Sequence, residues 1–295
     1  MPKNSLFFSF LFCFLLSANC LFSSPAADFV LLVVMDGLRG DAFSRPDTPN
    51  LKLLRDTGMW TTKAKSIEVT LTLPAHATIL TGQGLDKTGV RWNYHAVGRG
   101  RKCLCPNIFT LLHQQSFRSA AFHNKKKLQL LMDPDGMEKM EYCGWNPKKA
   151  TKAAVSYLRE GHPHFLFVHL AEPDSSGHRD GWMSEGYYAG LRRADACLGK
   201  LLLALYEARA TARTLIIVAS DHGGLGKKHG KNTVEERTVP LLLAGNMVKA
   251  GKLEDGVGIE NIVPTILYAL GAEIPQDMDG RPLTQAFENS YSRAD

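Results

Sequence analysis

Aspartate and histidine side chains that could bind metal ions follow three apolar runs of this sequence. They are Asp36, Asp174, His178, Asp221, His222 and His229. Zinc accepts carboxylate and imidazole ligands in this combination. Two cations about 4 Å apart can hold both the attacking and the leaving oxygen of an in-line displacement at phosphorus. The residue types and their positions therefore predict a two-metal site for phosphoryl transfer.

Thr72 supplies a hydroxyl group at the predicted start of a helix. Pro74 suits the first turn of that helix, which is expected to run to Thr81 and to end at Gly82. Free N–H groups and the helix dipole favour an anion at such an end. A nearby cation would also lower the pKa of the hydroxyl and make it a usable nucleophile. Thr72 is therefore either a helix cap or the attacking group.

Apolar runs typical of buried strands precede each cluster, and helical patterns separate them. The expected strands are 29–34, 165–170, 215–219 and 239–244, and the longer helices are 146–160, 184–208 and 260–270. This alternation predicts an α/β fold, a three-layer sandwich with a mostly parallel central sheet and helices on both faces. The carboxyl ends of parallel strands would bring the three clusters to one edge.

The chain of 295 residues begins with a segment unlike the remainder. Lys3 is the sole charge before Asp28, and 6–22 is almost wholly apolar. Residues 1–27 are therefore interpreted as a secretory signal peptide, with an uncleaved anchor as the alternative. We expect an exported protein, periplasmic or secreted, with one catalytic domain over 28–295. No later apolar run is long enough to span a bilayer.

The net charge of +6 is mild, and no pattern typical of nucleic-acid binding is present. Basic residues gather at 99–102 and 125–127, and we interpret them as solvated loop charges rather than as an anion site. His76 and His169 are interpreted as packing residues. In an exported protein, a disulfide from Cys143 to Cys103 or Cys105 is the first expectation.

Taken together, the motifs resemble the alkaline phosphatase superfamily, and within it the nucleotide pyrophosphatase/phosphodiesterase branch. The strings that carry the resemblance are Met35-Asp36-Gly37, residues 70–82, Trp92-Asn93, residues 172–178, Asp221-His222-Gly223 and His229-Gly230. They span nearly all of the chain after the predicted signal. The Glu-Pro-Asp-Ser-Ser-Gly-His string at 172–178 is the most specific of them.

The resemblance implies a site with two zinc ions (Zn²⁺), with manganese (Mn²⁺) as the alternative. One ion would be held by Asp36, Thr72, Asp221 and His222, and the other by Asp174, His178 and His229. Thr72 would be the nucleophile and would form a phosphothreonyl intermediate. Asn93 and the Thr72 backbone N–H would bind a nonbridging phosphate oxygen. Trp92, Tyr94 and Trp145 could line the leaving-group pocket.

Two departures from the family pattern bear on the substrate. Leu73 stands where relatives that bind nucleotides carry a stacking aromatic residue, and only residues 223–228 separate His222 from His229. The short spacing also occurs in sulfatase-like proteins, but these need a modifiable cysteine or serine at position 72, and this chain has threonine. The implied function is hydrolysis of small phosphate esters, diesters in the first place. A phosphomonoesterase, a phosphonate hydrolase, a phosphotransferase and a catalytically decayed metal-binding protein are the alternatives.

Overall fold

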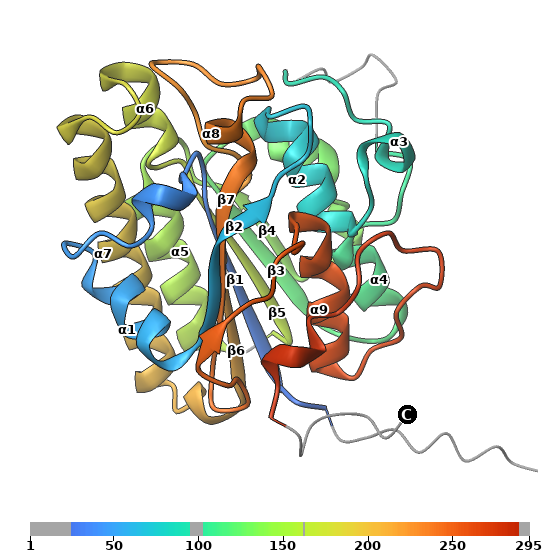
Figure 1. The fold of residues 1–295 in the computed structure, drawn as a ribbon. Coiled ribbons are helices and arrows are strands. Elements are labelled where there is room, and N and C mark those ends of the chain that lie inside the picture. Colours follow the sequence, from blue (N-terminus) through green and yellow to red (C-terminus); the bar gives the residue numbers. More distant parts are fainter. Residues whose placement is uncertain (1–24, 95–102, 162, 289–295) are drawn as a thin grey trace, which may run out of the picture.

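The computed structural model describes residues 25–94, 103–161 and 163–288. The strands within these ranges form one eight-stranded sheet (Figure 1). Its strands are β1 (Phe29–Met35), β2 (Met59–Lys65), β3 (Ser119–His123), β4 (Lys139–Tyr142), β5 (Phe165–Leu170), β6 (Thr214–Ala219), β7 (Thr238–Ala244) and β8 (Gly251–Lys252). The spatial order is β4-β3-β5-β1-β6-β7-β2-β8. β7 runs antiparallel to both β6 and β2, and every other pairing is parallel. The expected mostly parallel sheet is confirmed.

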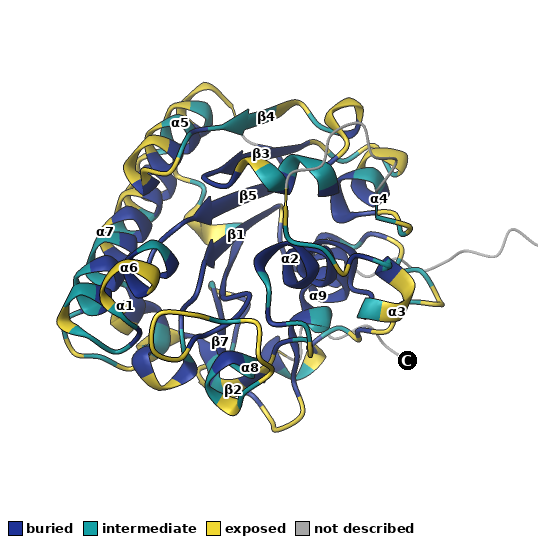
Figure 2. Ribbon diagram, turned by 90° about the horizontal axis from the view of Figure 1, so that it is seen from above, coloured by how far each residue is buried: buried dark blue, intermediate teal, exposed yellow. Residues whose placement is uncertain are grey.

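Helices cover both faces of the sheet, as Figure 2 shows from above. The helices are α1 (Pro49–Thr57), α2 (Thr72–Thr81), α3 (Leu85–Thr88), α4 (Ile108–Gln114), α5 (Pro147–Glu160), α6 (Asp174–Asp180), α7 (Glu185–Glu207), α8 (Val234–Arg237) and α9 (Ile262–Leu270). The α1, α5 and α7 helices lie on one face, and α2, α4 and α9 lie on the other (Figures 1 and 2).

The central strand β1 explains why the sheet needs both helical layers. Val30, Leu32 and Val34 belong to one buried apolar cluster, and the alternate residues Leu31 and Val33 belong to the other. Successive side chains of a strand point to opposite faces. An uninterrupted apolar run is therefore buried on both sides, as parallel strands usually are.

The register of the three central strands aligns their carboxyl ends. Met35 of β1 pairs with Leu170 of β5, and Val34 pairs with Ala219 of β6. The residues that follow these strands consequently leave the sheet side by side. This register is what gathers the clusters at one edge.

Several local expectations are corrected by the structure. Strand β2, which begins at Met59, is not among the strands expected from the sequence. The basic run 125–127 is not wholly solvated, because Lys125 is only 3% exposed. The expected disulfide is absent from the structure, in which all four cysteines of the described chain are free.

Two expectations concern residues outside the part of the chain that the structure describes. Residues 1–24, which make up most of the predicted signal peptide, lie there, as do the basic residues at 99–102. Within the described ranges, no helix combines the length and the apolar character needed to cross a bilayer.

Candidate active site

The predicted site residues meet at the carboxyl edge of the sheet. Asp36 directly follows β1, Asp174 begins α6 four residues after β5 ends, and Asp221 and His222 follow β6. Thr72 is the first residue of α2, as the sequence predicted. The two aspartates, His222 and Thr72 are buried together with Asp174, whereas His229 is only partly buried and His178 is exposed, so the centre is open to solvent on the side of these two histidines.

One predicted ligand group assembles as the resemblance implied. Donor atoms of Asp174, His178 and His229 lie within 4.8 Å of one another. Asp174 Oδ1 is 3.3 Å from His178 Nε2 and 3.6 Å from His229 Nε2. Asp174 and His178 are four residues apart on α6 and therefore share one helix face.

The second group assembles with a different membership. Asp36 and His222 lie together with Asp174, which belongs to both groups. Asp221 is adjacent, with its Oδ2 atom 3.3 Å from His222 Nε2, while its Oδ1 atom accepts hydrogen bonds from the backbone N–H groups of Gly37 and His222. Asp174 thus lies between the two groups.

The three histidines of the site are held in the tautomer that a metal ion requires. The Nδ1 atom of His178 contacts the Lys227 carbonyl at 3.0 Å, that of His222 contacts the Gly223 carbonyl at 2.8 Å, and that of His229 contacts the Thr70 carbonyl at 2.7 Å. A carbonyl oxygen only accepts, so each Nδ1 carries the proton. Each Nε2 lone pair is therefore free to bind an ion, as is usual for metal-ligating histidine.

Unpaired carboxylate oxygens complete the case for cations at this centre. Asp36 Oδ1, Asp174 Oδ1 and Asp221 Oδ2 are buried and have no hydrogen-bond partner among the described residues. Buried acceptors are normally satisfied, and buried charges are normally paired or bound to metals. The oxygen and nitrogen donors present suit zinc or manganese. The residues therefore fit a divalent metal centre.

Lys125 is the main site residue that the sequence analysis missed. Its Nζ atom lies 2.7 Å from Asp36 Oδ2, 2.7 Å from Asp174 Oδ2 and 3.1 Å from Thr72 Oγ1. Each of the two carboxylates therefore gives one oxygen to the lysine and leaves the other without a protein partner. Lys125 follows β3 by two residues, so it leaves the same edge of the sheet as the aspartates.

Charge interactions fix the protonation states around Lys125. Burial disfavours its ammonium form, but the charges of Asp174, Asp36 and Asp221 outweigh this cost and raise the pKa of Lys125. Burial also opposes ionisation of Asp36, yet Lys125 and the hydrogen bond from His169 hold the pKa of Asp36 well below its usual range. Near neutral pH the lysine is therefore a cation that faces ionised aspartates.

Thr72 faces these charges from the N-terminal end of α2. Its Oγ1 atom is 3.4 Å from His222 Nε2, in addition to the contact with Lys125. The Thr72 backbone N–H has no acceptor within the described chain. The hydroxyl thus lies where an attacking group would have a cation beside it and a free amide donor at hand.

Asn93 occupies a position that differs in detail from the expectation. Its Oδ1 atom accepts a hydrogen bond from the Leu73 backbone N–H at 3.0 Å and another from Lys127 Nζ at 2.7 Å. The amide therefore caps the first turn of α2, next to Thr72. Burial, followed by repulsion from Lys125, lowers the pKa of Lys127 to about 8. Lys127 is a second lysine of the site that the sequence analysis left among solvated charges.

Two histidines interpreted as packing residues instead contact the ligands. His169 Nδ1 accepts from the Asn124 backbone N–H, so its proton is on Nε2, which donates to Asp36 Oδ2 at 2.8 Å. His76 Nδ1 lies 2.8 Å from the Thr72 carbonyl and 3.3 Å from Asp221 Oδ2. Both rings are fully buried. His169 therefore helps to orient the Asp36 carboxylate, and His76 that of Asp221. The signals available in the sequence were that His76 lies four residues after Thr72 and that His169 lies near the end of a strand.

Close backbone contacts set the shape of the centre. Gly37 adopts φ +73°, and a Cβ atom there would lie 2.8 Å from the Asp174 Cα and Cβ atoms. Only glycine tolerates both the left-handed conformation and this approach. On the other side, the buried carboxylate of Glu236 accepts hydrogen bonds from the Thr70 hydroxyl and from the backbone N–H groups of Gly230 and Lys231. Glu236 thereby ties the His229 loop to the turn before Thr72.

Comparisons with known proteins show which family this chain is similar to. The family model "Sulfatase" matches residues 28–272. The chain is 35% identical to human arylsulfatase K over 115 residues, which are 36% of this chain and 22% of the relative. It is 27% identical to a 2,3-bisphosphoglycerate-independent phosphoglycerate mutase of Rhodopirellula baltica over 143 residues, 46% of this chain and 25% of that protein. These matches cover about a quarter or less of the relatives' own lengths.

Solved structures share the fold. A 2-O glycosaminoglycan sulfatase superposes with a TM-score of 0.74 at 15% identity, covering 88% of this chain and 74% of that one. Murine ectonucleotide pyrophosphatase/phosphodiesterase 5 superposes with a TM-score of 0.73 at 14% identity, covering 85% and 97%. The superfamily expected from the motifs is confirmed, and the family match favours the sulfatases over the phosphodiesterase branch.

Proposed function

This chain belongs to the Sulfatase family of the alkaline phosphatase superfamily, and we propose that it hydrolyses phosphate monoesters with Thr72 as the nucleophile. Two divalent cations, zinc in the first place, would be held by the two ligand groups around Asp174. The observation that carries the proposal is the position of the Thr72 hydroxyl, 3.1 Å from Lys125 Nζ and 3.4 Å from His222 Nε2.

Threonine at this position favours phosphorus over sulfur chemistry. Sulfatase-like proteins need a cysteine or serine at this position that is modified before it acts. The β-carbon of threonine already bears a methyl group and a hydroxyl group, so oxidation would give a ketone rather than an aldehyde. An unmodified hydroxyl that attacks directly fits phosphoryl transfer.

The residues of the chain have distinct tasks in this reaction. The bound cations would lower the pKa of the hydroxyl and stabilise the charge that develops at phosphorus. Lys125 donates a hydrogen bond to Thr72 Oγ1 and so favours its ionised form. The hydroxyl proton leaves to solvent, the Oγ1–P bond forms, the bond from phosphorus to the ester oxygen breaks, and that oxygen takes up a proton from solvent to leave as the alcohol. Water then cleaves the phosphothreonine and releases phosphate.

The two lysines favour a monoester over the diester that the resemblance implied. Lys125 and Lys127 add two positive charges to those of the cations, and a monoester phosphate carries about −1.5 to −2 charges at pH 7. Preorganised positive charge is most effective where negative charge is concentrated. A diester, with a single negative charge, would leave more of the positive charge of the site unbalanced.

Sulfate ester hydrolysis is the second candidate, because the family match and arylsulfatase K both point to it. Export also remains a proposal, supported by the signal-like sequence of residues 1–27. The relatives' own substrates are not transferred to this chain, since the matched segment is a small part of each relative.

The test compares p-nitrophenyl phosphate, bis(p-nitrophenyl) phosphate and p-nitrophenyl sulfate on purified protein loaded with zinc or manganese. The monoester is expected to have the highest kcat/KM, and Thr72→Ala is expected to lower it at least 1,000-fold, roughly 4 kcal/mol of transition-state stabilisation, while both metal ions remain bound. Thr72→Ser retains a hydroxyl group and is expected to retain part of the activity. Wild-type turnover by Thr72→Ala would refute the nucleophile assignment, and a preference for the sulfate ester would replace the proposed substrate class.

A further inference from the structure

Trp182 is a buried aromatic residue that packs against two histidines of the open group (Asp174, His178 and His229). It lies in the turn between α6 and α7 and is only 7% exposed. The centroid of its ring is 5.1 Å from that of His178 and 5.9 Å from that of His229, at interplanar angles of 84° and 67°. Edge-to-face contacts at such distances are attractive. Two of the three ligands of the open group therefore share one aromatic neighbour.

Hydrogen bonds connect Trp182 to the loops that follow two other strands. Its Nε1 atom donates to the Gly37 carbonyl at 2.9 Å, and its backbone N–H donates to the Gly226 carbonyl at 2.7 Å. Gly37 directly follows Asp36, and Gly226 belongs to the loop that carries His229. Trp182 therefore ties both of these loops to the end of α6.

The backbone around Trp182 leaves the indole little room to move. A Cβ atom at Gly177 would lie 2.7 Å from atoms of the indole ring, and one at Gly224 would lie 2.3 Å from them. Only glycine permits so close an approach. Gly177 directly precedes His178, and Gly224 belongs to the loop that carries His229. The two segments that carry the histidines are therefore packed closely against the indole.

His178 is the ligand that most needs such support. Its side chain is 46% exposed, against 3% for Asp174 and 6% for His229. Fixing an exposed side chain in one rotamer costs conformational entropy. The contact with the Lys227 carbonyl fixes its Nδ1 atom, and the contact with Trp182 restricts the orientation of the ring. Groups that orient a metal ligand in this way typically contribute about 10–100-fold to metal affinity.

We propose that Trp182 is a positioning residue that orients His178 and His229 for the metal ion of the open group. The proposal rests on the metal centre of the proposed function, but it does not depend on which ester is hydrolysed. Among the histidines of the two ligand groups, only His178 and His229 make ring contacts with Trp182 in the described ranges. A change at Trp182 is therefore expected to weaken one metal site much more than the other.

The experiment counts bound zinc by mass spectrometry after dialysis at a series of free zinc concentrations. Trp182→Phe keeps an aromatic ring and removes the indole N–H. Tyr187 also donates to the Gly37 carbonyl, at 3.1 Å, so that carbonyl keeps a donor in the variant. We expect Trp182→Phe to need at least about ten-fold more free zinc than wild type to bind its second ion. His178→Ala removes a ligand and should lose the same ion.

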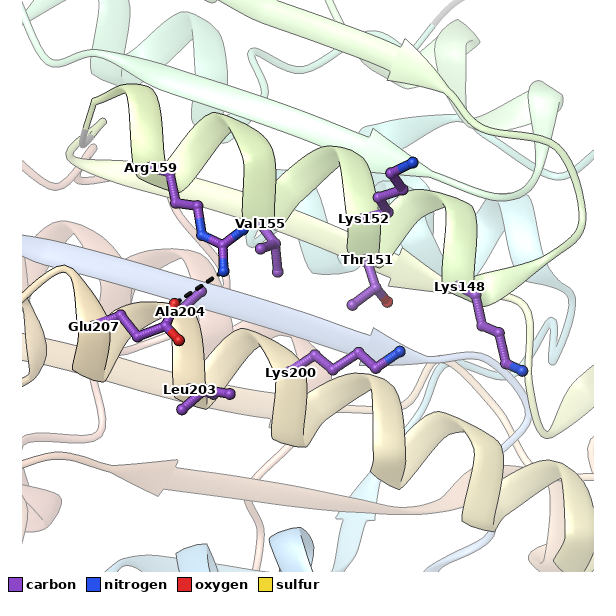
Figure 3. Close-up of a pocket in the computed structure, with 9 residues that line it drawn as sticks. All are labelled: Lys148, Thr151, Lys152, Val155, Arg159, Lys200, Leu203, Ala204 and Glu207. Atoms are coloured by element: carbon purple, nitrogen blue, oxygen red, sulfur yellow. Dashed lines mark hydrogen bonds and ion pairs between the residues drawn. The ribbon is translucent and has the colours of Figure 1, made fainter.

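Two variants control for changes elsewhere in the chain. Trp145→Phe replaces a tryptophan that is 62% exposed. Val155→Ala removes side-chain volume from the groove between α5 and α7 (Figure 3), and the described residues that line this groove belong to neither ligand group. Both variants should bind each zinc ion with an affinity within about two-fold of wild type.

Tryptophan fluorescence provides a second readout that needs no substrate. An ion bound by His178 and His229 changes the charge beside the Trp182 indole, so the emission of wild type and of Trp145→Phe should change as the second ion binds. The emission of Trp182→Phe should not change, because that variant lacks the indole. The emission of His178→Ala should not change either, because that variant keeps the indole but lacks the ligand.

Equal zinc affinities in wild type and Trp182→Phe would overturn the positioning role. If Trp182→Phe did not fold, the titrations of wild type and His178→Ala would decide, and a wild-type emission that stayed constant while the second ion bound would overturn it. A wild type that bound no zinc would instead refute the metal centre of the proposed function. A preference for sulfate esters would change the proposed substrate class and leave these binding results as they are.

Discussion

Replacing Lys125 by methionine tests the charge balance on which the site depends. The lysine ammonium lies 2.7 Å from carboxylate oxygens of both Asp36 and Asp174, and all three residues are at most 3% exposed. Methionine keeps much of the side-chain volume and removes the charge. In the metal-free protein, Lys125→Met would therefore leave two buried carboxylates facing each other without a nearby lysine.

The expected loss of stability follows from the cost of breaking a buried ion pair. Removing one partner of such a pair typically costs about 3–5 kcal/mol, because the other charge stays buried and uncompensated. For a chain of this size, each kcal/mol shifts Tm by about 2–4 °C. We therefore expect Lys125→Met to lower Tm by roughly 6–20 °C in EDTA. Saturating zinc or manganese should recover much of this loss, because cations would supply the missing positive charge.

The pH dependence of the free energy of unfolding tests the same charge balance independently. Lys125 and His169 lower the folded-state pKa of Asp36 despite its burial, so the stabilisation is present above the unfolded pKa of about 3.9 and is lost as pH falls toward the folded value. The gap in stability between wild type and Lys125→Met should therefore narrow as pH falls below about 4.

Thermal and guanidinium unfolding, each with EDTA and with added metal, would measure these effects. Lys126→Met is the matched control, because Lys126 is the exposed neighbour of Lys125 and should change Tm by only about 1–2 °C. If Lys125→Met unfolded at the wild-type midpoint in EDTA, Lys125 would not neutralise the carboxylates. The reasoning about the charge balance would then be refuted.

Two further substitutions test the site from other directions. Because its pKa is lowered to about 8, Lys127 is a cation below that pH and loses its charge as pH rises through it. We therefore expect kcat/KM to decline above pH 8 and Lys127→Arg to move this decline upward by at least about one pH unit. An unchanged pH profile in Lys127→Arg would show that Lys127 does not bind the substrate. Gly37→Ala should push Asp174 out of place and reduce metal affinity about 10–100-fold, measured by counting bound ions after dialysis. Gly256→Ala is its control, because Gly256 also has a positive φ but has no atom within 4 Å of the added Cβ, and equal metal contents in the two variants would contradict the steric argument.

The central strands and the aspartates that follow them could be predicted from the sequence because the physics there is local. β1, β5 and β6 are uninterrupted apolar runs, and parallel strands that are buried on both faces require such runs. β2 escaped prediction because its sequence mixes polar and apolar residues. A register shift between Thr61 and Ala64 also breaks its alternation.

Lys125 was harder to predict, because its position depends on partners far away in the sequence. A run of three lysines usually indicates a solvated loop, and Lys126, in the middle of this run, is indeed exposed. The signal that could have found Lys125 is its place two residues after the short strand β3, which also ends at the active-site edge. His169 was missed for a related reason. A histidine inside an apolar strand gives no sign that it contacts a carboxylate, here that of Asp36, which directly follows the neighbouring strand β1.

The charges of the centre bear on how metal binding and substrate binding are linked. Asp36, Asp174 and Asp221 contribute three negative charges, and Lys125 contributes one positive charge, so the protein alone leaves about two negative charges buried there. One divalent cation would neutralise them, and a second would make the centre positive. Lys127, at the rim and only partly buried, adds to that excess below pH 8. With two divalent cations bound, the centre would carry excess positive charge, which a phosphate dianion would neutralise. The charge of the buried Lys125 is therefore a stronger argument for a monoester than the metal ligands are.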